Sequence, residues 1–411
     1  MRFPAARSCC SLRRVPPRRG AAPRGVRSAP VRGGALGLAA ACAWAAAAAC
    51  AADAPIAAPA DFQPYRQTLP GSEVGFDLVP VAGGVLRLRP APGAGVAEEG
   101  SDVVIRLAPF WMGRCEVRWA EYRQYMDLCQ AFERFDDAGL RQLADKHGAD
   151  AITAPSQLYD PSFTYAPGDG PDHPAVSMSQ YAAKQYAKWL SLTTGLFYRL
   201  PTDAEWEYAC RAGSDAAYSF GDEPAQLAEA GWYDDNSDDA THPAGEKLPN
   251  AWGLYDMHGN ACEWVLDAYR PDWYPQFRGR TISGEEAICW PDRLYPRVLR
   301  GGSWRLDAAD CRSDARRPSD DDAWRSYDPN SPQSPWWFAS DEAQDVGFRL
   351  VRPVEPPPRD DWPRYWDADL PAIQQVVDQR IDKEGRGRRG LADSGLPAAV
   401  RRLEAPATTA P

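Results

Sequence analysis

Two segments of the chain have the pattern of a capped amphipathic helix, and a third has the apolar spacing alone. Ser179 can cap a helix that runs through Leu192, with aromatic and small apolar residues along its inner face. Thr202 and Glu205 stand three residues apart just before an apolar stretch, which is a capping-box pattern. A further helix is predicted over Trp119–Phe132.

Short apolar runs bounded by glycine or proline predict strands, for example Leu78–Val81 and Val298–Leu299. The chain also holds 39 Pro and 33 Gly, so turns and loops should outweigh long helices. No internal repeat is evident. The pattern predicts an α+β fold with short strands, a few helices and much irregular loop.

The N-terminal stretch 1–52 predicts export. Residues 1–32 are basic and rich in proline, and Ala35–Ala52 is an apolar run of signal-peptide length. Two alternatives remain open: Cys50 as a lipidated cysteine, or the run as a single membrane anchor, although alanine drives membrane insertion only weakly. We expect a periplasmic or extracellular protein, and membrane contact only through lipidation or an uncleaved signal.

The remaining boundaries follow from composition. Residues 53–70 are expected to be a linker, 71–353 the folded domain, and 354–411 a proline-rich linker with a short helix and a disordered tail. The helix is predicted over Leu370–Lys383, where apolar residues recur near helical spacing.

Composition and charge narrow the classes of partner. The 411 residues are 44% hydrophobic, which is enough for a packed core. The net charge is −11, and residues 1–52 contribute nine arginines and no acidic residue, so the remainder carries −20 (−11 less nine positive charges). An acidic body argues against nucleic acid as a partner, because phosphate contacts need clustered Lys and Arg. The partner is expected to be a protein or a small molecule of unknown identity.

Ten cysteines are present, four of them within 1–52. The other six form no Cys-x-x-Cys pair and no Cys/His cluster with zinc spacing, so a structural zinc site is not expected. An exported protein can pair some of these thiols as disulfides. The six are Cys115, Cys129, Cys210, Cys262, Cys289 and Cys311.

Seven segments, taken together and in order, resemble the formylglycine-generating enzyme, or sulfatase-modifying factor, family. The resemblance implies a single domain of the C-type-lectin-like kind. The segments are Leu78–Gly84, Phe110–Val117, His173–Ser177, Arg199–Ala209, Pro249–Trp264, Arg297–Trp304 and Gly347–Arg349.

The resemblance also implies where an active member would keep its copper. Active members oxidise a sulfatase cysteine to formylglycine with oxygen and copper(I), which two cysteines hold shortly after the Gly-Gly-Ser-aromatic turn. Two thiolates suit this soft ion. Counting forward from Gly301, the family cysteines fall on Leu306 and Cys311; counting backward from Arg316, Cys311 matches neither. Either alignment leaves at most one thiolate, so copper is not expected.

The catalytic candidates are therefore weak. Cys311 is expected to be a buried small residue or half of a disulfide, with Cys210 as a hypothetical partner. Ser303 stands where active members keep a hydroxyl near the metal, and without the thiol pair it is expected to be a turn residue. Histidine-bound iron, known in a related sulfoxide-forming branch, is not expected, because the four histidines lack a paired spacing.

Calcium is the metal that the resemblance favours. Asp256 and Glu263 would supply carboxylates, and Gly259 and Ala261 main-chain carbonyls, which are the hard oxygen ligands that Ca²⁺ prefers. The alternative is that Glu263 pairs with an arginine and Asp256 caps a turn.

Two acidic loops lie near the expected site. The stretch Pro318–Asp345 carries Trp324, Tyr327, Trp336, Trp337 and Phe338, and it predicts either a recognition surface or aromatic residues that cover the core. Asp307, Asp310 and Asp314 are expected to face solvent, with a new chemistry of their own as the alternative.

Two function classes follow. The first is an exported, non-catalytic binding or accessory domain that keeps the family fold with altered loops. The second is an oxidoreductase that acts on the cysteine of a Cys-x-Pro-x-Arg sulfatase motif. The missing thiolate partner favours the first class.

Overall fold

A computed structural model describes residues 59, 61–88, 102–156, 158, 161–319, 334–338 and 343–404 of the chain. The expected signal segment 1–52 lies outside these residues. In the described part of the chain, no helix is long and apolar enough to cross a membrane.

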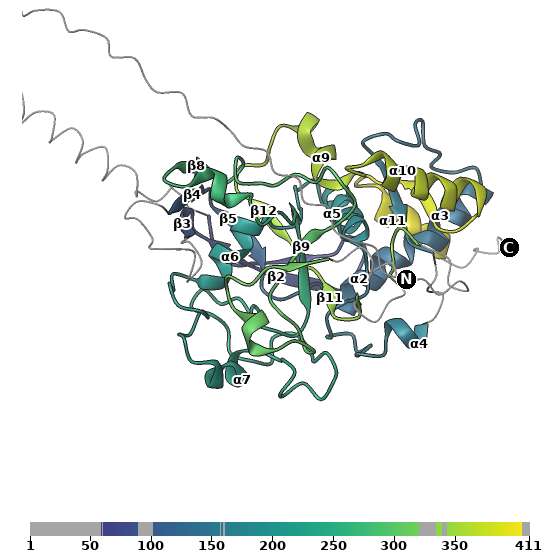
Figure 1. The fold of residues 1–411 in the computed structure, drawn as a ribbon. Helices are drawn as coiled ribbons and strands as arrows, with labels where there is room; N and C mark the ends of the chain where they lie inside the picture. Colours follow the sequence, from purple (N-terminus) through teal and green to yellow (C-terminus); the bar gives the residue numbers. More distant parts are fainter. Residues whose placement is uncertain are drawn as a thin grey trace, which may run out of the picture. The chain divides into compact units, whose positions relative to one another are not determined.

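Two four-stranded sheets form the centre of the fold (Figure 1). One has the order β1-β2-β5-β12, with antiparallel neighbours. The other has the order β10-β9-β7-β11, and its β11 runs parallel to β7. Their bounds are β1 Tyr65–Thr68, β2 Gly75–Val81, β5 Phe110–Gly113, β12 Val351–Pro353, β10 Arg317–Pro318, β9 Arg297–Arg300, β7 Cys262–Ala268 and β11 Val346–Gly347.

Two smaller sheets complete the strands that the structure describes. The order β3-β4-β8 joins Gly84–Leu88, Val103–Leu107 and Thr281–Ser283. The pair β13-β6 joins Arg388–Leu391 to Ala151–Ala154. The short strands and long connections confirm the predicted irregular α+β fold.

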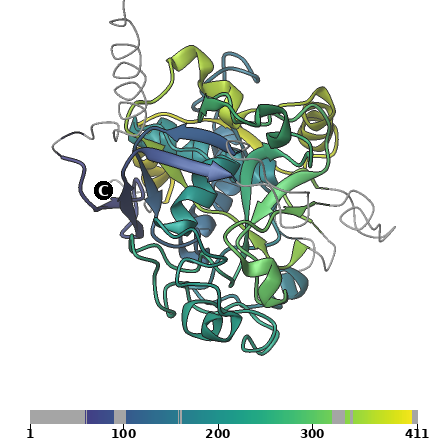
Figure 2. The same cartoon turned by 60° about the vertical axis from the view of Figure 1, so that its left-hand side comes forward.

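In Figure 1 the helices of residues 119–137, 180–194 and 371–404 lie to one side of these sheets, while those of 203–211, 227–230 and 362–366 lie elsewhere around them; Figure 2 shows the same fold turned by 60°. Their bounds are α2 Trp119–Met126, α3 Leu128–Asp137, α4 Pro161–Thr164, α5 Gln180–Thr194, α6 Asp203–Arg211, α7 Leu227–Ala230, α9 Trp362–Trp366, α10 Pro371–Asp378 and α11 Leu396–Glu404. Short 3-10 or π turns include η1 Pro224–Gln226, η2 Tyr274–Phe277, η3 Ala308–Cys311, η5 Arg359–Asp361 and η6 Gln379–Lys383.

Both predicted helix starts are confirmed. The Ser179 side chain accepts a hydrogen bond from the Ala182 amide at 3.1 Å. Thr202 accepts from the Glu205 amide, and Glu205 accepts in return from the Thr202 amide, so the capping box is complete. The helix predicted over Trp119–Phe132 is instead two helices that meet at Asp127, and each buries its own apolar face.

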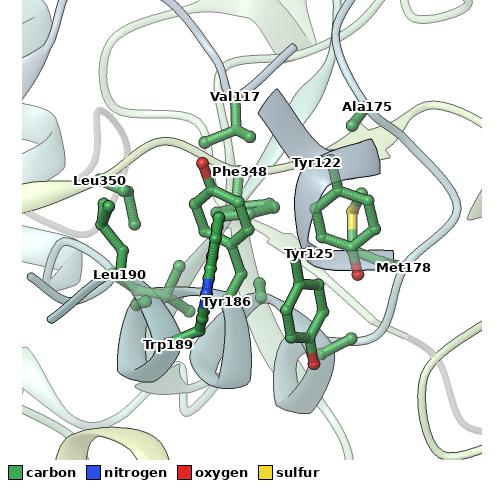
Figure 3. Close-up of a cluster of buried hydrophobic side chains, with 14 of the residues drawn as sticks. Val117, Tyr122, Tyr125, Ala175, Met178, Tyr186, Trp189, Leu190, Phe348 and Leu350 are labelled. Atoms are coloured by element: carbon green, nitrogen blue, oxygen red, sulfur yellow. The ribbon is translucent and has the colours of Figure 1, made fainter. Parts of the chain in front are cut away.

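The largest core cluster lies where α2 and α5 face each other (Figure 3). Tyr122, Tyr125 and Tyr186 form tilted, stacked and edge contacts with ring centroids 5.5–5.9 Å apart, and Phe348 completes the group. Such aromatic pairs stabilise the core beyond the area they bury. This cluster joins the first half of the domain to the segment that follows β11.

The C-terminal region differs from the expected linker and disordered tail. The helix expected over Leu370–Lys383 exists as α10 and η6, and β13 beyond it pairs with β6. Trp366, Val377 and Leu396 are buried in the main core cluster. Apolar residues spaced along 362–400 find their partners on α3 and α5, which composition alone did not reveal. The expected linker 53–70 likewise contains β1, which pairs with β2.

The aromatic residues of the Pro318–Asp345 stretch cover the core where the structure describes them. Trp336 is fully buried and Trp337 nearly so. The Trp336 indole lies within hydrogen-bond distance of the Thr153 hydroxyl, at 3.3 Å. Trp324 and Tyr327 lie outside the described residues.

Replacing Glu121 with glutamine is expected to change how stability depends on pH. Burial raises the pKa of Glu121 from 4.5 to about 7, although Arg118 lies 2.7 Å away. The folded state therefore holds a proton that the unfolded state releases above pH 4.5, so this group's stabilising contribution is full below pH 4.5 and is lost as the pH rises through about 7. The variant should gain up to about 3 kcal/mol relative to the native protein between pH 4.5 and 8, as measured by urea unfolding.

The matched control is Glu73→Gln, at an exposed carboxylate on the surface. It should leave the pH dependence of unfolding unchanged. If the free energy of unfolding of Glu121→Gln equals that of the native protein at both pH 4.5 and pH 8, Glu121 does not carry a raised pKa in the folded state.

Candidate functional site

The Gly-Gly-Ser turn after β9 leads into a buried polar cluster. The Ser303 hydroxyl donates to Asp345 at 2.5 Å, and Arg317 donates to the same carboxylate oxygen at 2.7 Å. Arg317 also lies 3.5 Å from the Cys262 sulfur. Ser303 and Asp345 are fully buried, so this arrangement holds the turn against the start of β11.

Cys311 packs directly onto the turn. A side-chain carbon built on Gly302, which has φ +69°, would lie 2.3 Å from the Cys311 sulfur, so only glycine fits there. The Cys311 side chain is fully buried. Burial raises the pKa of this thiol, and the nearby Cys262 raises it further.

Cys262 is a second thiol at this place that the sequence analysis did not pick out. It is the first residue of β7, and the pairing of Glu263 with Arg300 brings it beside the Gly301–Gly302 turn. Burial raises the pKa of Cys262 to about 12. Cys262 lies inside the motif segment Pro249–Trp264, but only the strand register shows that its thiol is a neighbour of the Cys311 thiol.

The copper that the family implies does not fit this pair as it stands. Copper(I) binds thiolates, and burial raises the pKa of both thiols, so neither forms a thiolate readily in the metal-free protein. The Arg317 guanidinium, which pairs with Asp345, occupies one side of the Cys262 sulfur. Leu306, where the forward alignment puts a family cysteine, is a half-buried apolar residue that packs against the core.

The residues predicted to bind calcium have other partners in this structure. Both Glu263 oxygens accept from Arg349, at 2.7 and 2.8 Å, and one also accepts from the Trp206 indole at 2.8 Å. Asp256 has φ +57° and one of its oxygens accepts from the Gly245 amide at 2.7 Å. This is the arrangement of the alternative hypothesis, an arginine pair and a turn cap.

In this structure Arg349 holds the Glu263 carboxylate. Across the ranges that the structure describes, no three or more His, Cys, Asp or Glu residues are grouped so that they could hold a metal ion. Calcium binding at Asp256, Gly259, Ala261 and Glu263 stays a prediction. Comparing the melting temperature of the protein in calcium with that in a chelator tests it.

A pair of buried carboxyl groups lies next to this network. Neither oxygen of Glu116 meets a hydrogen-bond donor among the described residues, and the Asp256 oxygen that Gly245 does not bind also lacks one. Burial raises the pKa of Glu116 well above its usual value and that of Asp256 to about 6. Asp256 adds to the rise in the pKa of Glu116, because two neighbouring carboxyl groups disfavour carrying two negative charges.

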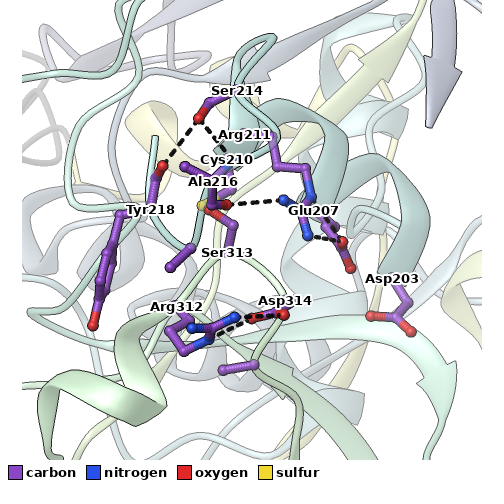
Figure 4. Close-up of polar contacts among 12 residues, drawn as sticks. Asp203, Glu207, Cys210, Arg211, Ser214, Ala216, Tyr218, Arg312, Ser313 and Asp314 are labelled. Atoms are coloured by element: carbon purple, nitrogen blue, oxygen red, sulfur yellow. Dashed lines mark hydrogen bonds and ion pairs between the residues drawn. The ribbon is translucent and has the colours of Figure 1, made fainter. Parts of the chain in front are cut away.

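The six cysteines of the described part are all free thiols, so the hypothetical Cys210–Cys311 bridge is wrong for this structure. The Cys210 sulfur instead contacts the Met257 carbonyl at 3.4 Å and the His258 ring at 3.7 Å. Asp307, Asp310 and Asp314 are exposed, and Asp314 pairs with Arg312, as Figure 4 shows.

Comparison with known proteins identifies the family. Residues 68–354 match the model of the sulfatase-modifying factor enzyme 1-like domain, which is most of the chain. The chain belongs to the sulfatase-modifying factor family. The predicted resemblance is thereby confirmed.

Curated relatives of this sulfatase-modifying factor family member differ in function. A formylglycine-generating enzyme of Thermomonospora curvata is 30% identical over 275 residues, covering 58% of this chain and 86% of that protein. A serine/threonine-protein kinase pkn1 of Chlamydia pneumoniae is 36% identical over 143 residues, which are 34% of this chain. The match spans only 20% of that kinase's length.

Among solved structures, Treponema denticola variable protein 1 matches 72% of this chain and 100% of its own, with 22% identity and a TM-score of 0.49. This similarity concerns the fold alone.

Proposed function

We propose that this chain is an exported binding or accessory member of the family, and that it does not generate formylglycine. One observation carries the proposal: the only described thiols at the Gly-Gly-Ser turn, Cys262 and Cys311, are both buried, and the Arg317 guanidinium lies against Cys262. A peptide thiol cannot reach a sulfur that has no exposed surface. The expected export rests on the N-terminal stretch 1–52.

The alternative function is formylglycine-generating oxidation, and Cys262 is the observation in its favour. It supplies a second sulfur near Cys311 in place of the cysteine missing at Leu306. If Arg317 moved away, the two thiols could bind copper(I) as thiolates. The following experiment separates the two functions.

Copper-loaded protein is incubated with a peptide that carries a Cys-x-Pro-x-Arg motif under air, and the peptide is analysed by mass spectrometry. We expect no product with the mass of an aldehyde in place of the thiol. The formylglycine-generating enzyme of Thermomonospora curvata serves as the positive control. Aldehyde formation that is lost in Cys262→Ser and kept in Cys289→Ser would contradict the proposal and establish the alternative.

A further inference from the structure

A serine and a histidine outside the Gly-Gly-Ser site are arranged as a nucleophile and a base. The Ser219 hydroxyl lies 2.9 Å from Nε2 of His258. On the other side of the ring, Nδ1 of His258 lies 2.8 Å from the main-chain carbonyl oxygen of Cys311. Three segments far apart in the sequence thus meet at one imidazole.

The Cys311 carbonyl determines the tautomer of His258. A carbonyl oxygen can only accept, so Nδ1 must carry the hydrogen and Nε2 must present a lone pair. Nε2 has this one lone pair, and the Ser219 hydroxyl at 2.9 Å shares it with the Ser219 amide at 3.1 Å. The carbonyl thereby orients the ring and would stabilise the positive charge that forms when Nε2 takes a proton, which is the role of the third group in a catalytic triad.

The protonation states of the neighbours leave this pair free to react. Burial raises the pKa of Cys210 to about 12, so the thiol 3.7 Å from Nε2 stays protonated and does not compete as a nucleophile. Ser219 itself is half-buried and therefore reachable from solvent.

Ser219 lines a small open cavity. The cavity has a volume of about 170 Å³, and its lining includes Phe220, Leu248 and Pro249 together with the polar side chains of Gln226, Glu229 and Asn250. Leu248 makes one wall of the cavity apolar. This size suits a short acyl or alkyl group rather than a long chain, and the Glu229 carboxylate disfavours an anionic group.

Donors for a developing oxyanion are available at the same cavity. Within the described residues, the Phe220 amide and the Gln226 side-chain amide donate no hydrogen bond to the protein. The amide of the residue after a nucleophilic serine is a common member of an oxyanion hole. Tyr218, just before the serine, stacks on Phe220 with ring centroids 5.0 Å apart, and its hydroxyl donates to the Ala308 carbonyl, which together hold the turn in place.

Hydrogen bonds from the residues that precede Ser219 also hold its turn in place. The Ser214 hydroxyl donates to the Tyr218 carbonyl at 3.2 Å, and Figure 4 shows this segment beside Cys210. The Ala217 amide donates to Asp222 at 2.8 Å. A nucleophile on a braced turn keeps its geometry, as catalysis requires.

We propose that Ser219 and His258 form a catalytic pair that hydrolyses small esters with a short apolar group. The Ser219 oxygen attacks the ester carbonyl carbon while its proton passes to Nε2 of His258. The carbon–oxygen bond to the alcohol then breaks, and the alcohol leaves with that proton. Water attacks the acyl-serine in the second half, giving up a proton to Nε2, and releases the carboxylic acid with Ser219 restored.

This site uses neither Ser303 nor the Cys311 thiol, so it is independent of the proposed function. The test uses a fluorophosphonate probe, which labels activated serines, and p-nitrophenyl acetate as an ester substrate. We expect one adduct per chain, mapped to Ser219 by peptide mass spectrometry. Ser219→Ala should abolish the adduct and lower ester hydrolysis at least about 100-fold.

Ser283→Ala is the matched control, because that serine is exposed on β8 and does not line the Ser219 cavity. It should keep labelling and hydrolysis. His258→Gln removes the base and should lower the labelling rate at least about 100-fold, with circular dichroism as the check that it folds; should it not fold, Ser219→Ala decides the question. Native protein that is not labelled at Ser219, or hydrolysis that Ser219→Ala retains, would overturn the proposal.

Discussion

Replacing Arg349 with methionine is expected to lower the free energy of unfolding by about 3–5 kcal/mol, because it leaves a buried carboxylate without its counter-charge. Arg349 and Glu263 are both fully buried and lie 2.6 Å apart at their closest atoms. The same guanidinium donates to the carbonyls of Gly113 and Tyr255, at 3.1 and 2.9 Å. The substitution therefore also leaves main-chain acceptors unpaired, and urea unfolding at pH 7 measures the loss.

Two further variants make this prediction specific. Arg66→Met breaks an exposed pair with Asp77 and should cost no more than about 1 kcal/mol, because solvent screens that pair. The double variant Arg349→Met with Glu263→Met should be more stable than Arg349→Met alone, since no unpaired charge stays buried. If Arg349→Met were as stable as the native protein, the Arg349–Glu263 pair would not hold the segment Pro249–Trp264 to the segment Gly347–Arg349.

Truncating Trp366 to alanine should lower the free energy of unfolding by about 3–5 kcal/mol, although it lies beyond the segment that matches the family. Trp366 is 2% exposed, and its indole donates to the Tyr198 carbonyl at 2.8 Å. Its ring centroid lies 5.2 Å from that of Phe197. The substitution removes packing against Phe197 and leaves the Tyr198 carbonyl without its donor, and chemical denaturation measures the effect.

Val376→Ala is the matched control within the same C-terminal region. Val376 is 40% exposed on α10, so its loss should cost less than about 1 kcal/mol. If Trp366→Ala were equally mild, the C-terminal region would not be part of the cooperatively folded core.

Features that depend on neighbours in the sequence could be predicted well. Ser179 and Thr202 cap their helices through hydrogen bonds three residues away, so the pattern alone contains both partners. The seven motif segments likewise identified the family, since each is read locally. The break at Asp127 was missed because apolar spacing continues through it while the buried face changes.

The sequence by itself determined the fold class, the family and the helix starts of this protein, because these depend on local hydrogen bonds and short motifs. Only the tertiary structure decided which distant side chains meet. It placed Cys262 beside the Gly-Gly-Ser turn onto which Cys311 packs. It also paired Glu263 with Arg349 and brought the Ser219 hydroxyl to the His258 ring. It also packed the C-terminal region onto the core. These pairings depend on strand register and on packing between residues up to 240 positions apart, which neither composition nor periodicity encodes.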